Sequence, residues 1–227
     1  MATQIHTVAN ELRRRIASGF YTPGERLLEL ALSAELGASR TPIRLAFEEL
    51  AKEGLLERLP TRGFRVKSFS ADELADAIDV RGALEGMAAR LAAERRPTDA
   101  QVQSLQECVA QGRAILVDAR SNDQHIDAAR WIAMNAAFHS TLLAAAQNAA
   151  LADAVAHVSK HPLAGAQALS HGIAPRLEFA LIERAQLDHE DVVQSVLAGE
   201  GVRAEALMRE HARRSRDNKR ELLTGKR

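Results

Sequence analysis

The spacing of apolar residues near the start of the chain predicts amphipathic helices. Val8, Leu12 and Ile16 recur every four residues, so a helix over residues 8–17 would have one apolar side. A second, shorter helix is expected over residues 29–36. Glycine and proline residues between the two segments supply the turn. A small helical domain is therefore expected at this end of the chain.

A third helix is expected to begin in the stretch GASRTPIRLAFEEL, residues 37–50, and to end near Lys52. Its first turn tolerates Pro42, because the first N–H groups of a helix have no partner within the helix. Ser39 or Thr41 can act as the N-cap. Apolar side chains then recur at helical spacing and should face a core; they are Ile43, Phe47 and Leu50.

The pattern changes after Gly54 from a helical period to the alternation of β-strands. Phe64 and Val66 alternate with Arg65 and Lys67, and the residues PTRG separate this run from an earlier extended run, LLERL. This pattern predicts a two-stranded hairpin with a basic tip. Three helices followed by such a hairpin form a winged helix-turn-helix.

From Ser70 onward the pattern predicts only helices. Ser70 and Glu73 form a capping box, which begins a helix that ends near Arg96. Further helices are expected over residues 98–119, 123–146, 151–160, 175–198 and 201–223. The expected fold is mainly α, with a winged helix-turn-helix over residues 1–69 and an antiparallel all-α bundle over residues 70–227.

Composition adds limits on the class of protein. The chain has 227 residues, of which 46% are hydrophobic and 26% charged, as in ordinary globular proteins. No apolar run is long enough to span a membrane, and the first residues lack the apolar core of a secretory signal, so a cytoplasmic protein is expected. The single cysteine, Cys108, excludes an intramolecular disulfide.

The net charge of zero conceals an asymmetry between the two expected domains. Residues 1–69 carry 11 Lys and Arg against 8 Asp and Glu, a balance of +3, whereas residues 70–227 carry 19 against 22, a balance of −3. A basic first domain favours a polyanionic partner at that end only.

The crowded first turn of the third helix fits DNA recognition. The second helix of a helix-turn-helix enters the major groove by its N-terminal end, where Arg40 and Arg44 could reach guanine edges or phosphates. The hydroxyls of Ser39 and Thr41 could bind phosphate oxygens. Alternatively, the stretch only caps a helix and its arginines are solvated, but the neighbouring helix, turn and basic hairpin favour the DNA interpretation.

This part of the chain resembles the DNA-binding domain of the GntR family of bacterial transcriptional regulators. The resemblance is carried by IASGFYTPGERL at residues 16–27, LGASRTPIR at 36–44, EGL at 53–55 and the wing dipeptide Arg62-Gly63. It implies that six residues contact double-stranded DNA: Ser39, Arg40, Thr41, Arg44, Arg62 and Gly63.

In the expected bundle, Arg81 lies where an apolar residue would be ordinary. On a helical wheel it falls about 20° from Leu74, inside a stripe that also holds Ile78 and Leu84. A buried guanidinium is costly unless an anion meets it. Glu85, four residues later, could be that anion. The alternative is that Arg81 binds the carboxylate of a small ligand.

Two further pairs of polar residues are expected inside the bundle. Asn135 and His139 share the face of Trp131 and Phe138, and form either an internal hydrogen-bond network or part of a metal site. His189 and His211 are 22 residues apart on two helices joined at residues 199–201. Since these helices should be antiparallel neighbours, the two imidazoles end at similar heights.

These features extend the resemblance to the FadR-like subgroup of GntR regulators, whose effector domain is all-helical (FCD-type), and within it to the VanR-type branch. There an Asp-x-x-x-His pattern and two later histidines hold a divalent metal. The resemblance implies a metal site of Asn135, His139, His189 and His211. Asn135 stands where the family has Asp, which weakens the site and leaves the ion's charge uncompensated. Three histidines suit Zn²⁺ or Ni²⁺, and Mn²⁺ if a carboxylate joins.

Taken together, the sequence predicts a transcriptional regulator, and a repressor rather than an activator. A homodimer would bind a two-fold symmetric operator in the bacterial cytoplasm, associated with the nucleoid. A small carboxylic acid would bind Arg81 and Asn135 in the helical domain, alone or through the metal. The alternative is a helical domain that only dimerises. An enzyme is not expected, because no HExxH motif, phosphate loop or carboxylate base accompanies the histidines.

Overall fold

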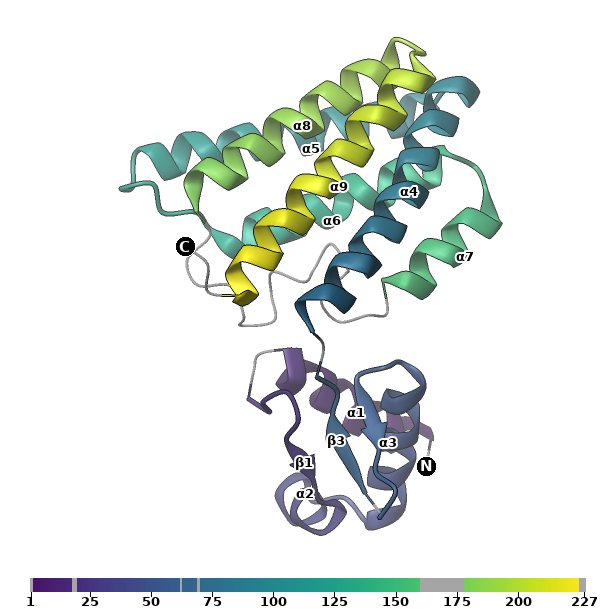
Figure 1. Ribbon diagram of the computed structural model, residues 1–227, viewed down its shortest axis with the longest axis vertical. Coiled ribbons are helices and arrows are strands. Elements are labelled where there is room, and N and C mark those ends of the chain that lie inside the picture. Colours follow the sequence, from purple (N-terminus) through teal and green to yellow (C-terminus); the bar gives the residue numbers. More distant parts are fainter. Residues whose placement is uncertain (1, 18–19, 62, 69, 160–177, 225–227) are drawn as a thin grey trace.

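The computed structural model describes residues 2–17, 20–61, 63–68, 70–159 and 178–224, which form a smaller and a larger part (Figure 1). In chain order the elements are α1 (Ala2–Ala17), β1 (Arg26–Leu27), α2 (Glu29–Leu36), α3 (Arg40–Lys52), β2 (Leu56–Arg58), β3 (Phe64–Val66), α4 (Ala71–Arg95), α5 (Asp99–Arg120), α6 (Ala128–Ala145), α7 (Ala149–Val158), α8 (Phe179–Leu197) and α9 (Gly201–Thr224). The fold class expected from the sequence is confirmed. Among the described helices, none has the length and apolar content needed to cross a bilayer.

The smaller part is built around an apolar core from its helices and its sheet. Leu12 of α1 and Ile43 and Phe47 of α3 have no exposed surface. Phe64 of β3 packs against Phe47, with the ring centroids 5.3 Å apart. Each such side chain contributes about 1.5–3 kcal/mol when fully buried. The apolar positions that recur at helical spacing in the sequence therefore face inward, as expected.

The sheet of the smaller part has one strand more than the sequence predicted. The strands are antiparallel in the order β1-β3-β2, with Leu56 opposite Val66 in the expected hairpin. β1 pairs with the other edge of β3 and places Leu27 opposite Phe64. Two residues are too few to show alternation in a sequence, so β1 left no signal. β1 therefore supports the hairpin along the edge of β3 that lies opposite β2.

The turn between α2 and α3 follows from two backbone conformations. Gly37 has φ 61°, the left-handed conformation that glycine adopts at little cost after a helix. Ser39 is extended at the N-cap of α3, with φ −66° and ψ 163°. Its side chain makes no capping hydrogen bond, however. The position of the predicted cap is therefore right, but the hydroxyl of Ser39 is not used by the helix.

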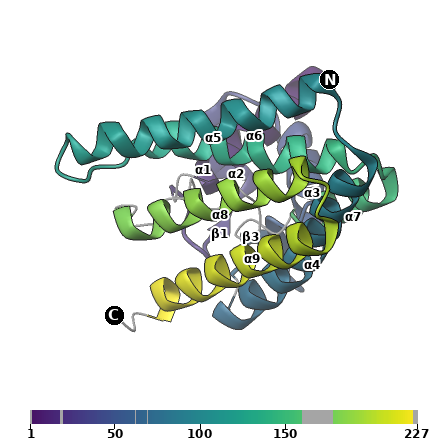
Figure 2. The ribbon, with the colours of Figure 1, turned by 90° about the horizontal axis from the view of Figure 1, so that it is seen from above.

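The larger part is a bundle, and residues 70–159 and 178–224 contain no strand. α9 lies between α4 and α8, α5 covers α6 and α8, and α7 packs on α4 (Figures 1 and 2). Trp131 and Phe138 of α6 and Met208 of α9 are fully or almost fully buried at its centre. The bundle therefore has one main core, to which α5, α6, α8 and α9 all contribute.

α4 and α9 approach each other closely because two glycines of α4 face α9. A Cβ at Gly82 would lie 2.5 Å from Cβ of Ala212, and one at Gly86 would lie 2.6 Å from Cγ of Arg209. Both distances are too short for carbon atoms in contact. The Gly-x-x-x-Gly spacing puts both positions on one side of α4. It therefore fixes the distance between α4 and the histidine-bearing face of α9.

The first part of α4 is fixed by a capping box at its N-terminus and by an ion pair with α9. Ser70 and Glu73 form the predicted capping box, in which each side chain accepts a hydrogen bond from the other residue's backbone N–H. Near this end, Arg216 of α9 forms a forked ion pair with Asp79, both contacts measuring 2.8 Å. α4 begins five residues after β3 ends, so the connection between the wing and the bundle is short.

Candidate functional site

The first turn of α3 is exposed on the smaller part. Ser39, Arg40, Thr41 and Arg44 all face solvent. The side chain of Arg40 is 68% exposed, and its Nη2 lies 3.2 Å from the carboxylate of Glu29. Such an exposed pair contributes little to stability, so a phosphate can replace the carboxylate at low cost.

Arg44 has no ion-pair or hydrogen-bond partner within the described part of the chain. It lies one turn after Arg40 on a helix whose N-terminal N–H groups carry partial positive charge. The hydroxyl of Ser39 beside these groups is also unused as a cap. The turn therefore offers several donors and two cations to an anionic surface, which is what phosphate and guanine recognition require.

The wing tip is only partly described, because the predicted contact residue Arg62 lies outside the described residues. Gly63 has φ 93°, a left-handed conformation that disfavours any side chain. A Cβ at this position would lie 3.7 Å from Nε of Arg26 in β1. β1 thus brings a further exposed arginine to the tip, which sequence reasoning missed together with the strand itself.

Three histidines meet inside the bundle. His139 of α6, His189 of α8 and His211 of α9 are 8%, 1% and 8% exposed, and one ligand atom from each lies within 4.8 Å of the others. Nitrogen ligands of Zn²⁺ lie about 2.0–2.1 Å from the ion, hence roughly 3.4 Å from each other. The separations in the cluster, up to 4.8 Å, exceed that spacing by no more than about 1.4 Å. The expectation that His189 and His211 both face the interior is confirmed.

His189 is the most enclosed member of the cluster. Its ring stacks on Phe138 with centroids 4.0 Å apart, and Trp131 lies parallel to it at 5.8 Å. Burial, followed by the charges of His211 and His139, lowers the pKa of His189 well below its usual value. The imidazole is therefore neutral at physiological pH, which is the form that binds a metal.

The cluster concentrates buried polar atoms without hydrogen-bond partners. Within the described residues there are five such side-chain atoms, and four of them lie here: Glu85 Oε2, His139 Nδ1 and both ring nitrogens of His189. Each costs about 1–3 kcal/mol if nothing satisfies it. An ion or ligand between the imidazoles would remove part of this cost.

Arg81 is buried in a pair with Glu85, the partner that the sequence offered as one alternative. Arg81 Nε donates to Glu85 Oε1 over 2.9 Å. Burial alone would raise the pKa of Glu85, but the charges of Arg81 and His139 hold it well below its ordinary value, so the carboxylate stays ionised. Lys219 of α9, partly exposed, lies within electrostatic reach of both groups. Burial of its ammonium, followed by the charge of Arg81, lowers its pKa to about 7.

Asn135 is also buried, as expected, and lies one turn before His139 on the inward face of α6. It is 8% exposed, as is His139. Both side chains therefore belong to the interior, where the sequence placed them.

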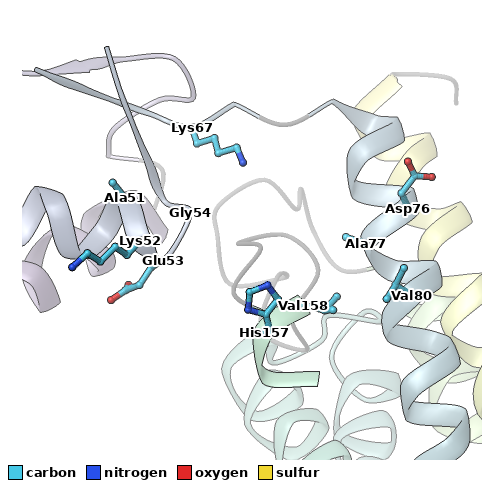
Figure 3. A pocket seen from close by; sticks show the side chains of 10 residues that line it. All are labelled: Ala51, Lys52, Glu53, Gly54, Lys67, Asp76, Ala77, Val80, His157 and Val158. Atoms are coloured by element: carbon cyan, nitrogen blue, oxygen red, sulfur yellow. The ribbon is translucent and has the colours of Figure 1, made fainter. Parts of the chain in front are cut away.

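A pocket of about 440 Å³ lies between the smaller and the larger part (Figure 3). It is lined by Ala51, Lys52, Glu53, Gly54, Lys67, Asp76, Ala77, Val80, His157 and Val158. Val80 immediately precedes Arg81 in α4, so one helix borders both this junction and the polar cluster of the bundle.

Two family models match the chain in adjacent segments. The model "Bacterial regulatory proteins, gntR family" matches residues 4–66, and the model "FCD domain" matches residues 76–214. The first segment holds α1 to β3 and the exposed turn of α3, and the second holds all three clustered histidines.

Individual relatives agree with these matches. A probable D-xylose utilization operon transcriptional repressor of Paenarthrobacter nicotinovorans is 36% identical over 64% of this chain and 62% of its own length. The repressor GlaR of Escherichia coli is 26% identical over 88% of both chains. The solved structure of Escherichia coli McbR/YncC has the same fold, with a TM-score of 0.71 at 21% identity and full coverage of both chains.

Proposed function

Because the chain belongs to the GntR family of bacterial transcriptional regulators and carries an FCD domain, we propose that it is a ligand-responsive repressor. Residues 1–69 bind DNA, and residues 70–227 bind a small organic acid and form the homodimer. The dimer presents two winged domains to a two-fold symmetric operator. The protein works in the bacterial cytoplasm on the nucleoid.

DNA binding is supported most directly by the exposed first turn of α3. Arg40 and Arg44 reach base edges or phosphates, and Ser39 and Thr41 bind phosphate oxygens. Two further proposed contacts come from the wing, namely Arg62 and Gly63. Arg26 adds charge beside Gly63. Gly63 lets the backbone of the tip lie close to the minor groove.

This DNA role is tested by selecting binding sites from random duplexes with the full-length protein and then measuring affinity for a selected site. Arg44→Ala should weaken binding at least about fivefold, since one good base contact contributes about 1–3 kcal/mol. Arg113→Ala, which removes an arginine of α5 that is also exposed, is the control and should change affinity less than twofold. Equal affinities for wild type and Arg44→Ala would refute the proposed DNA interface.

The sensing role is supported by the meeting of the three buried histidines, in which neither ring nitrogen of His189 has a hydrogen-bond partner among the described residues. His139, His189 and His211, with Asn135 as the weaker fourth ligand, would hold Zn²⁺, Ni²⁺ or Mn²⁺. Bound there, the ion would supply a cationic coordination site for a carboxylate. The chain's own residues set the charge around it, because the buried carboxylate of Glu85 is already paired with Arg81.

An anionic effector follows from that charge balance. Glu85 neutralises Arg81, and Lys219, whose pKa is lowered to about 7, keeps part of a positive charge that a nearby anion would stabilise. A small carboxylic acid would supply the missing negative charge, contacting Arg81 and Asn135. Because α4 carries Arg81 and leads directly into the wing, effector binding would favour one arrangement of the two winged domains over another.

A further inference from the structure

Two buried carboxylates lie on the outer sides of the histidine cluster, and neither was expected to touch a histidine. Oε1 of Glu85 is 3.1 Å from Nδ1 of His139, and Oδ2 of Asp188 is 3.5 Å from Nδ1 of His211. Glu85 and Asp188 are 6% and 2% exposed. The same ring atom, Nδ1, faces the carboxylate in both cases.

Each carboxylate is held in place by arginine. Arg81 Nε donates to Glu85 over 2.9 Å, and Arg184 and Arg214 donate to Oδ1 of Asp188 over 2.6 and 2.7 Å. The arginines of Asp188 bind Oδ1 and leave Oδ2 directed at the imidazole. On both sides of the cluster the order is therefore arginine, carboxylate, histidine.

This order determines which nitrogen of each ring is available. An imidazole that donates Nδ1–H to a carboxylate keeps its lone pair on Nε2, and outer carboxylates of this kind fix the orientation of metal-binding histidines. In the present side-chain positions Nδ1–H of His139 is not aligned with Glu85, so a small rotation of the ring is needed to complete the bond. Asp188 could not be recognised from sequence, because it adjoins His189 but contacts His211 of another helix.

We infer that Glu85 and Asp188 are positioning residues of the metal site, which hold His139 and His211 with hydrogen on Nδ1 and so direct Nε2 of both rings at the ion. This inference rests on the metal role proposed above. Because arginines already neutralise both carboxylates, the carboxylates can orient the two histidines without cancelling the charge of the ion. The anionic effector thus remains the group that supplies negative charge.

The test compares Glu85→Gln and Asp188→Asn with two matched controls in the full-length protein. Arg90 and Glu94 repeat the Arg-x-x-x-Glu pair of Arg81 and Glu85 on the exposed side of α4. Glu94→Gln is therefore the control for Glu85→Gln. Asp217→Asn, which removes the exposed partner of Arg213, is the control for Asp188→Asn.

Zn²⁺ affinity is measured by competition with a chromophoric chelator. Each positioning variant should bind Zn²⁺ about 10–100-fold more weakly than wild type. The controls should stay within about twofold. If wild type binds Zn²⁺ but Glu85→Gln and Asp188→Asn bind it equally well, the inference is wrong and the proposed metal site stands. If wild type binds no Zn²⁺, the metal role itself fails, and the inference with it.

A second measurement does not depend on metal affinity. Imidazole nitrogen NMR of the EDTA-treated protein reports which nitrogen carries hydrogen. Wild type should show Nδ1–H for His139 and His211, and Glu85→Gln should shift His139 toward Nε2–H, because the amide can donate to Nδ1. Nε2–H for both histidines in wild type would overturn the inference even if a variant failed to fold.

Discussion

Replacing His189 with leucine should stabilise the metal-free protein, although it removes a proposed ligand. His189 is 1% exposed and neither ring nitrogen has a hydrogen-bond partner among the described residues. Leaving buried polar groups unpaired costs about 1–3 kcal/mol each, which leucine avoids. Two losses oppose this gain. The change of side-chain shape costs up to about 1.5 kcal/mol, and the lost stacking on Phe138 costs a similar amount. With two unpaired nitrogens, the middle of these ranges leaves a net gain of about 1 kcal/mol.

The assay is thermal unfolding of wild type and His189→Leu, each in EDTA and in excess Zn²⁺. In EDTA the variant should unfold several degrees higher, since 1 kcal/mol corresponds to about 2–4 °C in a chain of this size. Zn²⁺ at a hundred times its Kd should stabilise wild type by about 2.7 kcal/mol and the variant by far less. The exposed His125→Leu is the control and should behave as wild type in both conditions.

Two results would refute this reasoning. A His189→Leu protein less stable than wild type in EDTA would mean that the imidazole already makes stabilising hydrogen bonds inside the protein. Equal stabilisation of both proteins by Zn²⁺ would mean that the ion binds elsewhere.

Two further predictions concern acid pH and the packing of α4 on α9. Burial is the largest of the effects that lower the pKa of His139 and His189 below its ordinary value. The EDTA-treated protein should therefore lose stability between about pH 8 and 5.5, by up to about 1.4 kcal/mol for each histidine, because the unfolded chain gains those protons more readily than the folded one. Unchanged urea denaturation over this range would contradict this prediction. Gly82→Ala should destabilise the protein by about 1 kcal/mol net, since overpacking against Ala212 costs about 1–3 kcal/mol and helix propensity returns up to 1. Adding Ala212→Gly should restore part of the urea midpoint, and a double variant no better than Gly82→Ala would argue against the clash.

Much of the fold could be read from the sequence because periodicity and capping are local signals. The capping box at Ser70 and the apolar stripe of α3 are examples, and both are present as predicted. The meeting of His189 and His211 was also predictable. The two residues are at similar distances from the turn that joins their helices, so they lie at similar positions along the bundle axis. Local signals thus placed the helices and the cluster.

What the sequence did not reveal depends on how elements rotate against one another. Asp188 reaches His211 only because α8 and α9 pack with a particular rotation, which no sequence spacing encodes. The start of α6 was misplaced for a local reason: Asp123 and Gln124 adopt left-handed φ values of 48° and 56°, which interrupt a helix. α6 therefore begins at Ala128, capped by Asp127, and not at residue 123 as expected.

In the proposed function, the histidine cluster controls how the exposed turn of α3 engages DNA. The most direct test of this control is the affinity of Zn²⁺-treated wild type and His189→Leu for one selected operator, titrated with a panel of small carboxylic acids. Without acid the two proteins should bind the operator with equal affinity, and one acid should change the affinity of wild type alone by at least tenfold. The same response in both proteins, or none to any acid in wild type, would contradict it.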